Sequence, residues 1–169
     1  MELSLQSFEK VTIEGNVAAT ILGTSAADIL TGDSGADVIT GRGGADTLTG
    51  GSRSDTFVFA TGDTGITEAT ADTITDFSTG TDKIDVDAPG TYVEADGTNT
   101  ADLAAFITNA DASLTTASDD IYAEYNFAGN GNTLVVIDEN ASATVDAGDT
   151  LIILTGLSTA GGLDASGFI

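Results

Sequence analysis

Four aspartates at a spacing of nine residues are the side chains whose pattern points to chemistry in this sequence. They are Asp28, Asp37, Asp46 and Asp55, and each lies two residues before an apolar residue and five residues after a glycine. Carboxylates that a repeat brings together repel each other, and a hard divalent cation between them reverses that repulsion. The pattern therefore predicts repeated cation sites built from carboxylate and backbone carbonyl oxygens, which are the ligands that calcium prefers.

The overall charge favours the same partner. The 169-residue chain has 27 acidic and four basic residues, which gives a formal net charge of −23. Such self-repulsion opposes the compact state unless cations neutralise it. The composition argues against nucleic acid and anionic membrane surfaces as partners, because phosphate binding needs clustered lysine and arginine.

The lack of cysteine and histidine restricts the chemistry further. Without these residues there are no disulfides, no thiolate or imidazole ligands for zinc, and no Ser-His or Cys-His catalytic pair. We therefore expect this chain not to be an enzyme. No apolar run approaches the ~18 residues of a membrane span, and residues 1–10 lack the basic and apolar regions of an amino-terminal signal peptide.

The repeat predicts its own supporting structure. Nine residues suffice for a six-residue loop and a three-residue strand, so two repeats complete one flattened coil of eighteen residues. Asp28 should then stack on Asp46 along one edge, and Asp37 on Asp55 along the opposite edge. The apolar residues should face inward from two sheets, Leu30 and Leu48 from one, and Ile21, Ile39 and Phe57 from the other.

We expect two regions, with the boundary after residue 59. Residues 1–59 hold a degenerate first turn, in which Ala19 stands where the repeats have aspartate, followed by the repeat block. Residues 60–169 form a β-rich region that begins with a polar loop. In residues 72–86 the apolar positions predict two short strands joined by a turn at Gly80.

The rest of the second region should contain one short helix. The helical spacing of apolar residues predicts it over about 101–114, with Thr100 as the N-cap. Three strands should follow, at 121–127, 133–138 and 150–154, joined by Gly- and Asn-rich turns. The chain ends on Phe168 and Ile169, which we expect to be exposed.

These motifs resemble a known family. The four copies GTSAADILT, GDSGADVIT, GRGGADTLT and GGSRSDTFV are similar to the calcium-binding repeats of RTX (repeats-in-toxin, or hemolysin-type) proteins, whose consensus is GGxGxDx(L/I/F)x. The later segments FVFATGDTG, ADTITDFSTGTDKIDV and LIILTGLSTAGGLDASGFI resemble the carboxyl-terminal domain of serralysin-type proteases and other RTX exoproteins of Gram-negative bacteria. Together the resemblance covers nearly the whole chain from about residue 15.

The resemblance implies a mainly β fold, with a short parallel β-roll followed by a β-sandwich-like secretion domain carrying one short helix. It also implies a function: a calcium-binding carboxyl-terminal module of a secreted bacterial protein, disordered in the cytoplasm and folding on extracellular calcium. The carboxyl terminus would carry an uncleaved type I secretion signal for an ABC exporter. The protein would then act outside the cell or at its surface.

The resemblance further implies which residues hold calcium. The first site would use carbonyls of Gly23 and Ser25 with Asp28, closed by carbonyls of Arg42 and Gly44 with Asp46. The second site would use Gly32, Ser34 and Asp37 with Gly51, Arg53 and Asp55. Two half-sites, Gly41, Gly43 and Asp46, and Gly50, Ser52 and Asp55, would need caps, for which Asp72 and Asp76 are the candidates.

The sequence departs from the family at several loop positions where glycine is preferred, namely Thr24, Ala26, Asp33, Arg42 and Arg53. We therefore expect modest calcium affinity, in the ~10⁻⁴ to 10⁻³ M range of extracellular modules. Gly167 replaces the acidic residue that the family usually has before the final phenylalanine.

Alternatives remain open at the level of sequence. The chain could be a structural surface-layer or adhesin subunit whose self-association is driven by calcium. Any protease activity of the serralysin type would lie outside this chain, because an HExxH zinc motif needs histidine. Some carboxylates could simply be solvated: Asp72, Asp76, Asp82 and Asp85 in the first strand pair, and, as the favoured interpretation, Asp138, Asp146 and Asp149, whose run lacks the central glycine of an EF-hand loop.

Overall fold

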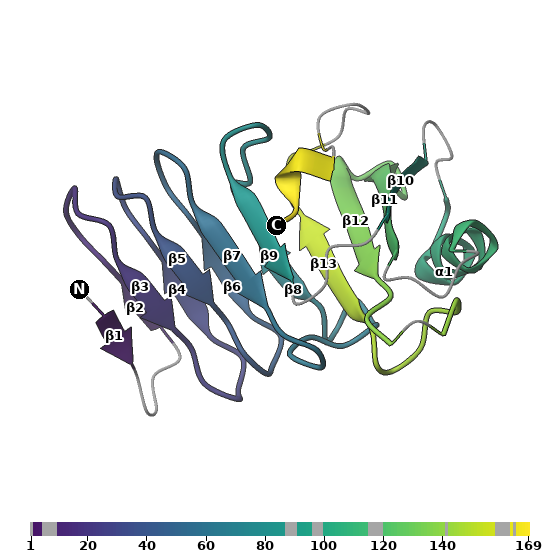
Figure 1. Cartoon of the computed structure of the whole chain (residues 1–169), viewed down its shortest axis with the longest axis horizontal. Helices are drawn as coiled ribbons and strands as arrows, with labels where there is room; N and C mark the ends of the chain where they lie inside the picture. Colours follow the sequence, from purple (N-terminus) through teal and green to yellow (C-terminus); the bar gives the residue numbers. More distant parts are fainter. Residues whose placement is uncertain are drawn as a thin grey trace.

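The structure, a computed structural model, describes residues 2–4, 10–86, 91–95, 100–114, 120–140, 142–157, 163 and 165–169. The molecule is elongated, with short strands stacked at the amino-terminal end and one helix at the far end (Figure 1). The first nine strands are β1 (Glu2–Ser4), β2 (Lys10–Thr12), β3 (Thr20–Leu22), β4 (Ile29–Thr31), β5 (Val38–Thr40), β6 (Thr47–Thr49), β7 (Thr56–Phe59), β8 (Asp72–Ile74) and β9 (Lys83–Val86). The remaining elements are β10 (Thr91–Ala95), α1 (Leu103–Ser113), β11 (Asp120–Phe127), β12 (Asn132–Ile137), β13 (Thr150–Leu154) and the 3₁₀ helix η1 (Ala165–Gly167).

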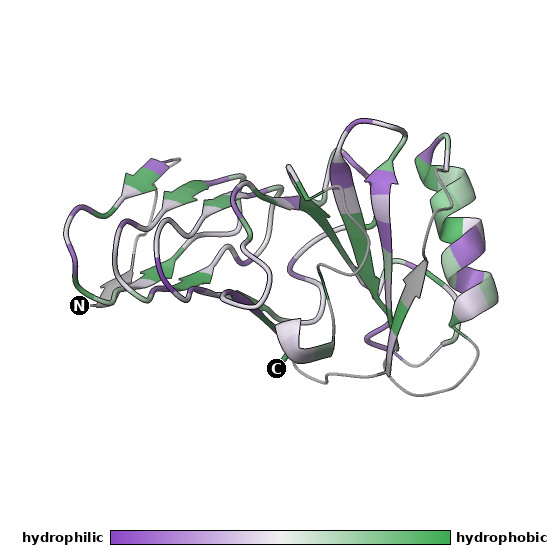
Figure 2. Cartoon of the chain, turned by 90° about the horizontal axis from the view of Figure 1, so that it is seen from above, coloured by the Kyte–Doolittle hydropathy of each residue, from purple (hydrophilic) through white to green (hydrophobic). Residues whose placement is uncertain are grey.

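Successive strands of the repeat block alternate between two sheets. One sheet has the order β1-β3-β5-β7-β9, and the other has the order β10-β11-β12-β13-β8-β6-β4-β2. All neighbours within the repeat block are parallel. Seen from above, the two layers lie one over the other and are joined by loops, which carry purple, hydrophilic positions (Figure 2). The predicted parallel β-roll is therefore confirmed.

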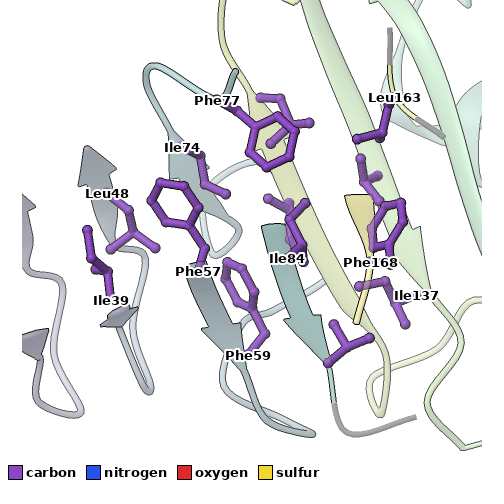
Figure 3. Close-up of a cluster of buried hydrophobic side chains, with 14 of the residues drawn as sticks. Ile39, Leu48, Phe57, Phe59, Ile74, Phe77, Ile84, Ile137, Leu163 and Phe168 are labelled. Atoms are coloured by element: carbon purple, nitrogen blue, oxygen red, sulfur yellow. The ribbon is translucent and has the colours of Figure 1, made fainter. Parts of the chain in front are cut away.

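The predicted register of the roll is also confirmed. Leu30 pairs with Leu48 in one sheet, and Ile21, Ile39 and Phe57 follow one another in the other sheet. All five side chains are fully buried. Strands β3 to β6 are three residues long, and in each of them only the central side chain enters the core while its neighbours face outward. Figure 3 shows this apolar stack continuing toward the carboxyl-terminal region.

The roll extends beyond the repeat block. Strands β8 and β9 are the two short strands predicted in residues 72–86, and Gly80 lies between them in the left-handed region with φ 75°. They do not pair with each other: β8 pairs with β6, and β9 pairs with β7. Each sheet therefore gains one more rung, with Ile74 stacked on Leu48 and Ile84 on Phe57. Sheet pairing thus crosses the boundary expected after residue 59.

The later strands attach to the roll through β8. Strand β13 is parallel to β8, whereas β12 is antiparallel to both of its neighbours, β11 and β13. The three strands predicted after the helix are confirmed as β11, β12 and β13. One face of this sheet continues the core of the roll, and the other face forms a second core against α1, which includes Phe106, Tyr122 and Leu134.

Helix α1 is confirmed, but its predicted cap is wrong. Asp102 is the N-cap, and its side chain accepts a hydrogen bond from the backbone N–H of Ala105 at 2.9 Å. Thr100 instead donates its backbone N–H and its hydroxyl to Oε1 of Glu124, a fully buried residue of β11. The Thr100 hydroxyl is therefore committed to a tertiary contact. No helix in the described parts of the chain has the length and apolar character needed to cross a membrane.

The carboxyl terminus corrects a second expectation. Phe168 was expected to be exposed, yet only 6% of its surface is accessible, whereas Ile169 is 50% exposed. The backbone of Ile169 donates to the Ile84 carbonyl at 3.0 Å and accepts from the N–H of Val86 at 3.1 Å. Sheet pairing with β9 therefore turns Phe168 into the core, which a sequence of alternating small and apolar residues did not reveal.

Adjacent residues of β4 provide a test of the roll. Leu30 is fully buried and its neighbour Ile29 is 45% exposed. In calcium-containing buffer, Leu30→Ala should lower the free energy of unfolding by about 2–5 kcal/mol, because it leaves a cavity in the apolar stack. Ile29→Ala, the control, should lower it by less than about 1 kcal/mol. Urea unfolding followed by circular dichroism measures both, and equal losses would contradict the register.

Candidate metal centre

Two rows of aspartates run along the edges of the roll. In the first row, the backbone N–H of Asp28 donates to Oδ1 of Asp46, and the N–H of Asp46 donates to Oδ1 of Asp72, both at 2.8 Å. The first pair spans eighteen residues, as predicted. Asp72, one of the two candidate caps from the sequence, therefore continues this row. The short loops and three-residue strands place each of these aspartates at the start of a strand, in equivalent positions of successive coils.

The second row lies along the opposite edge. The N–H of Ala19 donates to Oδ1 of Asp37, and the N–H of Asp37 donates to Oδ1 of Asp55, each at 2.8 Å. The N–H of Asp55 then donates to Oδ1 of Asp82 at 3.0 Å. Asp82 was not among the predicted site residues. Its signal was present in the sequence, because Asp82 lies two residues before the core residue Ile84, as each repeat aspartate precedes its own core residue.

Asp76, the second proposed cap, lies against the loop that precedes Asp55. Its Oδ1 accepts from the N–H of Gly50 at 2.9 Å, and its Oδ2 accepts from the N–H of Gly51 at 2.8 Å. Asp76 therefore contacts the predicted half-site, and both of its oxygens already accept backbone hydrogen bonds. Within the parts of the chain that the structure describes, the second row is continued by Asp82, and Asp76 holds the loop beside it.

The rows contain buried carboxylate oxygens without hydrogen-bond partners. Asp46, Asp55 and Asp72 are at most 1% exposed, and their Oδ2 atoms accept no hydrogen bond. A buried carboxylate oxygen without a partner is destabilising, and it is a natural ligand for a cation. These three atoms meet one requirement for a metal site.

Burial also shifts the proton affinity of the same groups. It raises the pKa of Asp46 and Asp55 to about 6 and that of Asp72 to about 8, from 3.8. Backbone hydrogen bonds lower these pKa values, and neighbouring carboxylates raise them further, including Asp28 beside Asp46 and Asp82 beside Asp55. Burial and mutual repulsion therefore make the ionised aspartates of the two rows unfavourable, and a bound cation would offset that cost.

Backbone oxygens converge beside the first glycine of the loops. Next to the α-carbon of Gly23 lie the carbonyl oxygen of Gly41 and Oδ2 of Asp28, both closer than 3.0 Å to the place where a side chain would begin. Next to Gly32 lie Oδ2 of Asp37 and the carbonyl oxygen of Gly50, equally close. Each pair joins a carboxylate of one coil with a carbonyl of the next. All these donors are hard oxygens, so the arrangement fits calcium.

Carboxylates alone are not gathered closely enough. Over the described segments, no group of three or more His, Cys, Asp or Glu side chains is placed to hold a metal ion. A site in this roll must therefore draw on backbone carbonyls as well as on aspartates. The other residues predicted to contribute carbonyls lie on the same stacked loops: Ser25, Gly43 and Gly44 on the edge of the first row, and Ser34, Gly51, Ser52 and Arg53 on the edge of the second.

Two arginines occupy backbone positions that favour glycine. Arg42 has φ 67° and Arg53 has φ 89°, both in the left-handed region. The Arg42 guanidinium donates from Nη1 to the carbonyl oxygen of Gly23 at 3.1 Å. That carbonyl is one of the predicted calcium ligands, so a positively charged side chain of the protein lies at the first predicted site.

An open groove of about 720 Å³ lies beside Arg42 and is lined by Thr24, Ser25, Thr40, Arg42, Gly43, Ala60 and Asp63. Asp63 comes from the polar loop after β7, where its Oδ2 accepts from the N–H of Ala60 at 3.0 Å. Burial is the largest cause of the raised pKa values of Asp46 and Asp72, and the negative charge of Asp63 raises them further. Asp63 lies outside the nine-residue period, so the repeat pattern gave no signal for it.

The carboxylates between β12 and β13 accept backbone hydrogen bonds of their own loop and lie outside the two rows. Asp138 and Asp149, expected to be solvated, are both fully buried. Asp138 accepts from the N–H of Ser142 and of Ala143, and Asp149 accepts from the N–H of Glu139 and of Asp146. Their oxygens therefore cap backbone donors of the loop between β12 and β13, which the sequence pattern did not indicate.

Two glycines of one loop provide a test of this geometry. A methyl group at Gly41 would meet Oδ2 of Asp46 closer than 3.0 Å, whereas at Gly43 its nearest neighbour would be the α-carbon of Ser25 at 3.7 Å. Gly41→Ala should therefore displace the Asp46 carboxylate and lower the melting temperature by several degrees, roughly the effect of 1–3 kcal/mol. Gly43→Ala should leave it nearly unchanged. Calorimetry in calcium measures both, and a larger loss for Gly43→Ala would contradict the loop geometry.

Comparison with known proteins bears on the repeat block. The family model of the RTX calcium-binding nonapeptide repeat (4 copies) matches residues 22–57. No curated protein matches the chain. Among solved structures, the chain is similar to the solution structures of two subunits of the Azotobacter vinelandii mannuronan C5-epimerase.

The AlgE6R3 subunit is 19% identical, with 98% of this chain and 86% of that chain covered and a TM-score of 0.46. The AlgE6R2 subunit is 23% identical, with 92% of each chain covered and a TM-score of 0.39. The family match spans the loops that carry Asp28, Asp37, Asp46 and Asp55. Residues 22–57 are therefore four RTX calcium-binding nonapeptide repeats, whose strands form part of both sheets of a parallel β-roll and whose loops form its edges.

Proposed function

We propose that this chain is the calcium-binding carboxyl-terminal module of a secreted bacterial protein, which folds when it meets extracellular calcium. The observation that carries the proposal is the pair of aspartate rows, in which Oδ2 of Asp46, Asp55 and Asp72 is buried without a partner. Buried, unpaired carboxylates at the same height in successive coils favour a cation-bound state. The net charge of −23 acts in the same direction.

In this proposal each site lies between two stacked loops of one edge. Asp28 and Asp46 contribute to the first site, with carbonyls of Gly23, Ser25, Arg42 and Gly44. Asp37 and Asp55 contribute to the second, with carbonyls of Gly32, Ser34, Gly51 and Arg53. Two observations support this pairing. Hydrogen bonds join aspartates that are eighteen residues apart in the sequence. In addition, the carbonyl oxygens of Gly41 and Gly50 lie beside the first glycines of the preceding coils, Gly23 and Gly32. When bound, calcium would supply positive charge between carboxylates that otherwise repel.

The half-sites at the end of the roll have different caps in this proposal. Asp72 follows Asp46 in the first row, and Asp82 follows Asp55 in the second. Asp76 holds the loop of the second half-site through its two backbone hydrogen bonds. The calcium-binding unit would then reach from residue 23 to residue 82 and include both strands that follow the repeats.

The same charge distribution supports a route through the cell. In the cytoplasm, where calcium is scarce, self-repulsion would keep the chain open, and an ABC exporter of the type I system would read an uncleaved signal at the carboxyl terminus. In the folded state that terminus is occupied: Phe168 is buried and Ile169 pairs with Ile84. The signal would therefore be read before folding, and calcium outside the cell or at its surface would then close the roll.

Calcium titration tests the binding proposal. We expect the β signal in circular dichroism to rise from chelator to millimolar calcium. Asp46→Asn should raise the calcium concentration at the midpoint by about tenfold or more, because a charged ligand becomes neutral. Asp85→Asn removes the same charge from a partly exposed position in β9 that does not take part in the hydrogen bonds of either row, and it serves as the control. An unchanged spectrum across the titration, or equal shifts for the two variants, would sink the proposal.

The raised pKa values give a pH dependence. In chelator, the folded state holds protons on Asp46, Asp55 and Asp72 more tightly than the unfolded state does. The protonation of these three carboxyl groups therefore stabilises the folded state fully below pH 3.8. This stabilisation is lost as the pH rises through about 6 and then about 8. The folded fraction of the calcium-free chain should therefore fall across this window. Circular dichroism in chelator at a series of pH values measures it.

Calcium should reverse that trend, because the ion binds the deprotonated carboxylates. The calcium concentration at the folding midpoint should fall as the pH rises through the same window. A calcium-free protein that gains stability between about pH 5 and about pH 7 would contradict the assigned proton affinities.

A further inference from the structure

Arg42 lies where two loops of the first row meet. It is the second residue of the loop that leads to Asp46, and its guanidinium reaches the carbonyl oxygen of Gly23 in the loop that leads to Asp28. The side chain therefore bridges two successive coils at 3.1 Å. It does so from a left-handed backbone position, where an arginine is less favourable than a glycine.

The chemistry of the two groups makes this contact relevant to calcium. A guanidinium is permanently charged and has only hydrogen-bond donors, so it takes one of the two lone pairs of the carbonyl oxygen and repels a metal ion that approaches the other. The Gly23 carbonyl is one of the proposed ligands of the first site, and Oδ2 of Asp28 lies next to the α-carbon of the same glycine. A calcium ion at that site would meet a carbonyl already engaged and a positive charge close by.

We propose that Arg42 is a tethered cation that competes with calcium for the first site and makes it weaker than the second. This inference rests on the proposed calcium-binding function. Wherever the first two coils are folded without calcium, the guanidinium links the two loops and offsets part of the negative charge of the row. Calcium binding requires Arg42 to release the Gly23 carbonyl, so the first site fills at a higher calcium concentration.

The second row contains a matched control. Arg53 also lies on a repeat loop, is also exposed, and also has a left-handed backbone, at φ 89°. Within the described part of the chain, the structure gives its guanidinium no hydrogen bond to a loop carbonyl of the neighbouring coil. Arg42→Gln and Arg53→Gln remove the same charge from equivalent backbone conformations. Only the first change removes a guanidinium from a proposed ligand.

Isothermal titration of the full chain with calcium chloride, fitted to two classes of site, tests the inference. We expect Arg42→Gln to lower the dissociation constant of the weaker class about threefold to tenfold, the effect of removing one partly exposed charge. Arg53→Gln keeps the backbone carbonyl that the second site would use, and it should leave the weaker class near its native value. In an Asp28→Asn background, which removes a carboxylate of the first site, Arg42→Gln should no longer tighten binding.

The results distinguish a failure of the inference about Arg42 from a failure of the proposed calcium-binding function. If the native chain binds no calcium at millimolar concentration, the proposed function fails and the inference fails with it. If the native chain binds calcium and Arg42→Gln leaves both classes unchanged, the inference is wrong and the function stands. Equal tightening by Arg42→Gln and Arg53→Gln would also overturn it, since that result reflects net charge and not the contact with Gly23.

Discussion

A hydrogen bond between successive coils supports the whole roll: a backbone N–H of one coil donates to the aspartate carboxylate of the next. Asp28 donates in this way to Asp46, and Asp37 to Asp55. Each aspartate in the middle of a row is both donor and acceptor, so removing one carboxylate leaves a buried N–H unpaired. Ala19 has the N–H without the carboxylate, and the second row therefore begins there.

The same bond determines where negative charge gathers. It holds each carboxylate at the start of a strand, buried and one coil away from the next carboxylate. Only one oxygen of each group is satisfied by the backbone in Asp46, Asp55 and Asp72. The interaction that positions the rows thus also makes them unfavourable in the absence of a cation. This coupling explains how one short repeat can specify both a fold and a dependence on metal.

Much of the fold could be predicted from the sequence because the nine-residue period links a turn, a carboxylate and a core residue. The sheets, the stacking of Leu30 on Leu48 and the pairing of the aspartates follow from that period. The site was predicted less completely. Asp82 was not predicted as a site residue because the spacing changes after Asp55, although its position before Ile84 repeats the motif. Asp63 lies in a loop of no fixed period, and only the folded chain brings it near Asp46.

The sequence by itself determined the local pattern: which residue of each repeat turns, which carries charge and which enters the core. Such features depend on neighbours within nine or eighteen residues, so periodicity reveals them. The tertiary structure alone decided the contacts that join distant segments. It assigned β8 and β9 to different sheets, buried Phe168 against β9, and directed the Arg42 guanidinium to the Gly23 carbonyl. These depend on which coils come to lie side by side, and no spacing in the chain encodes that choice.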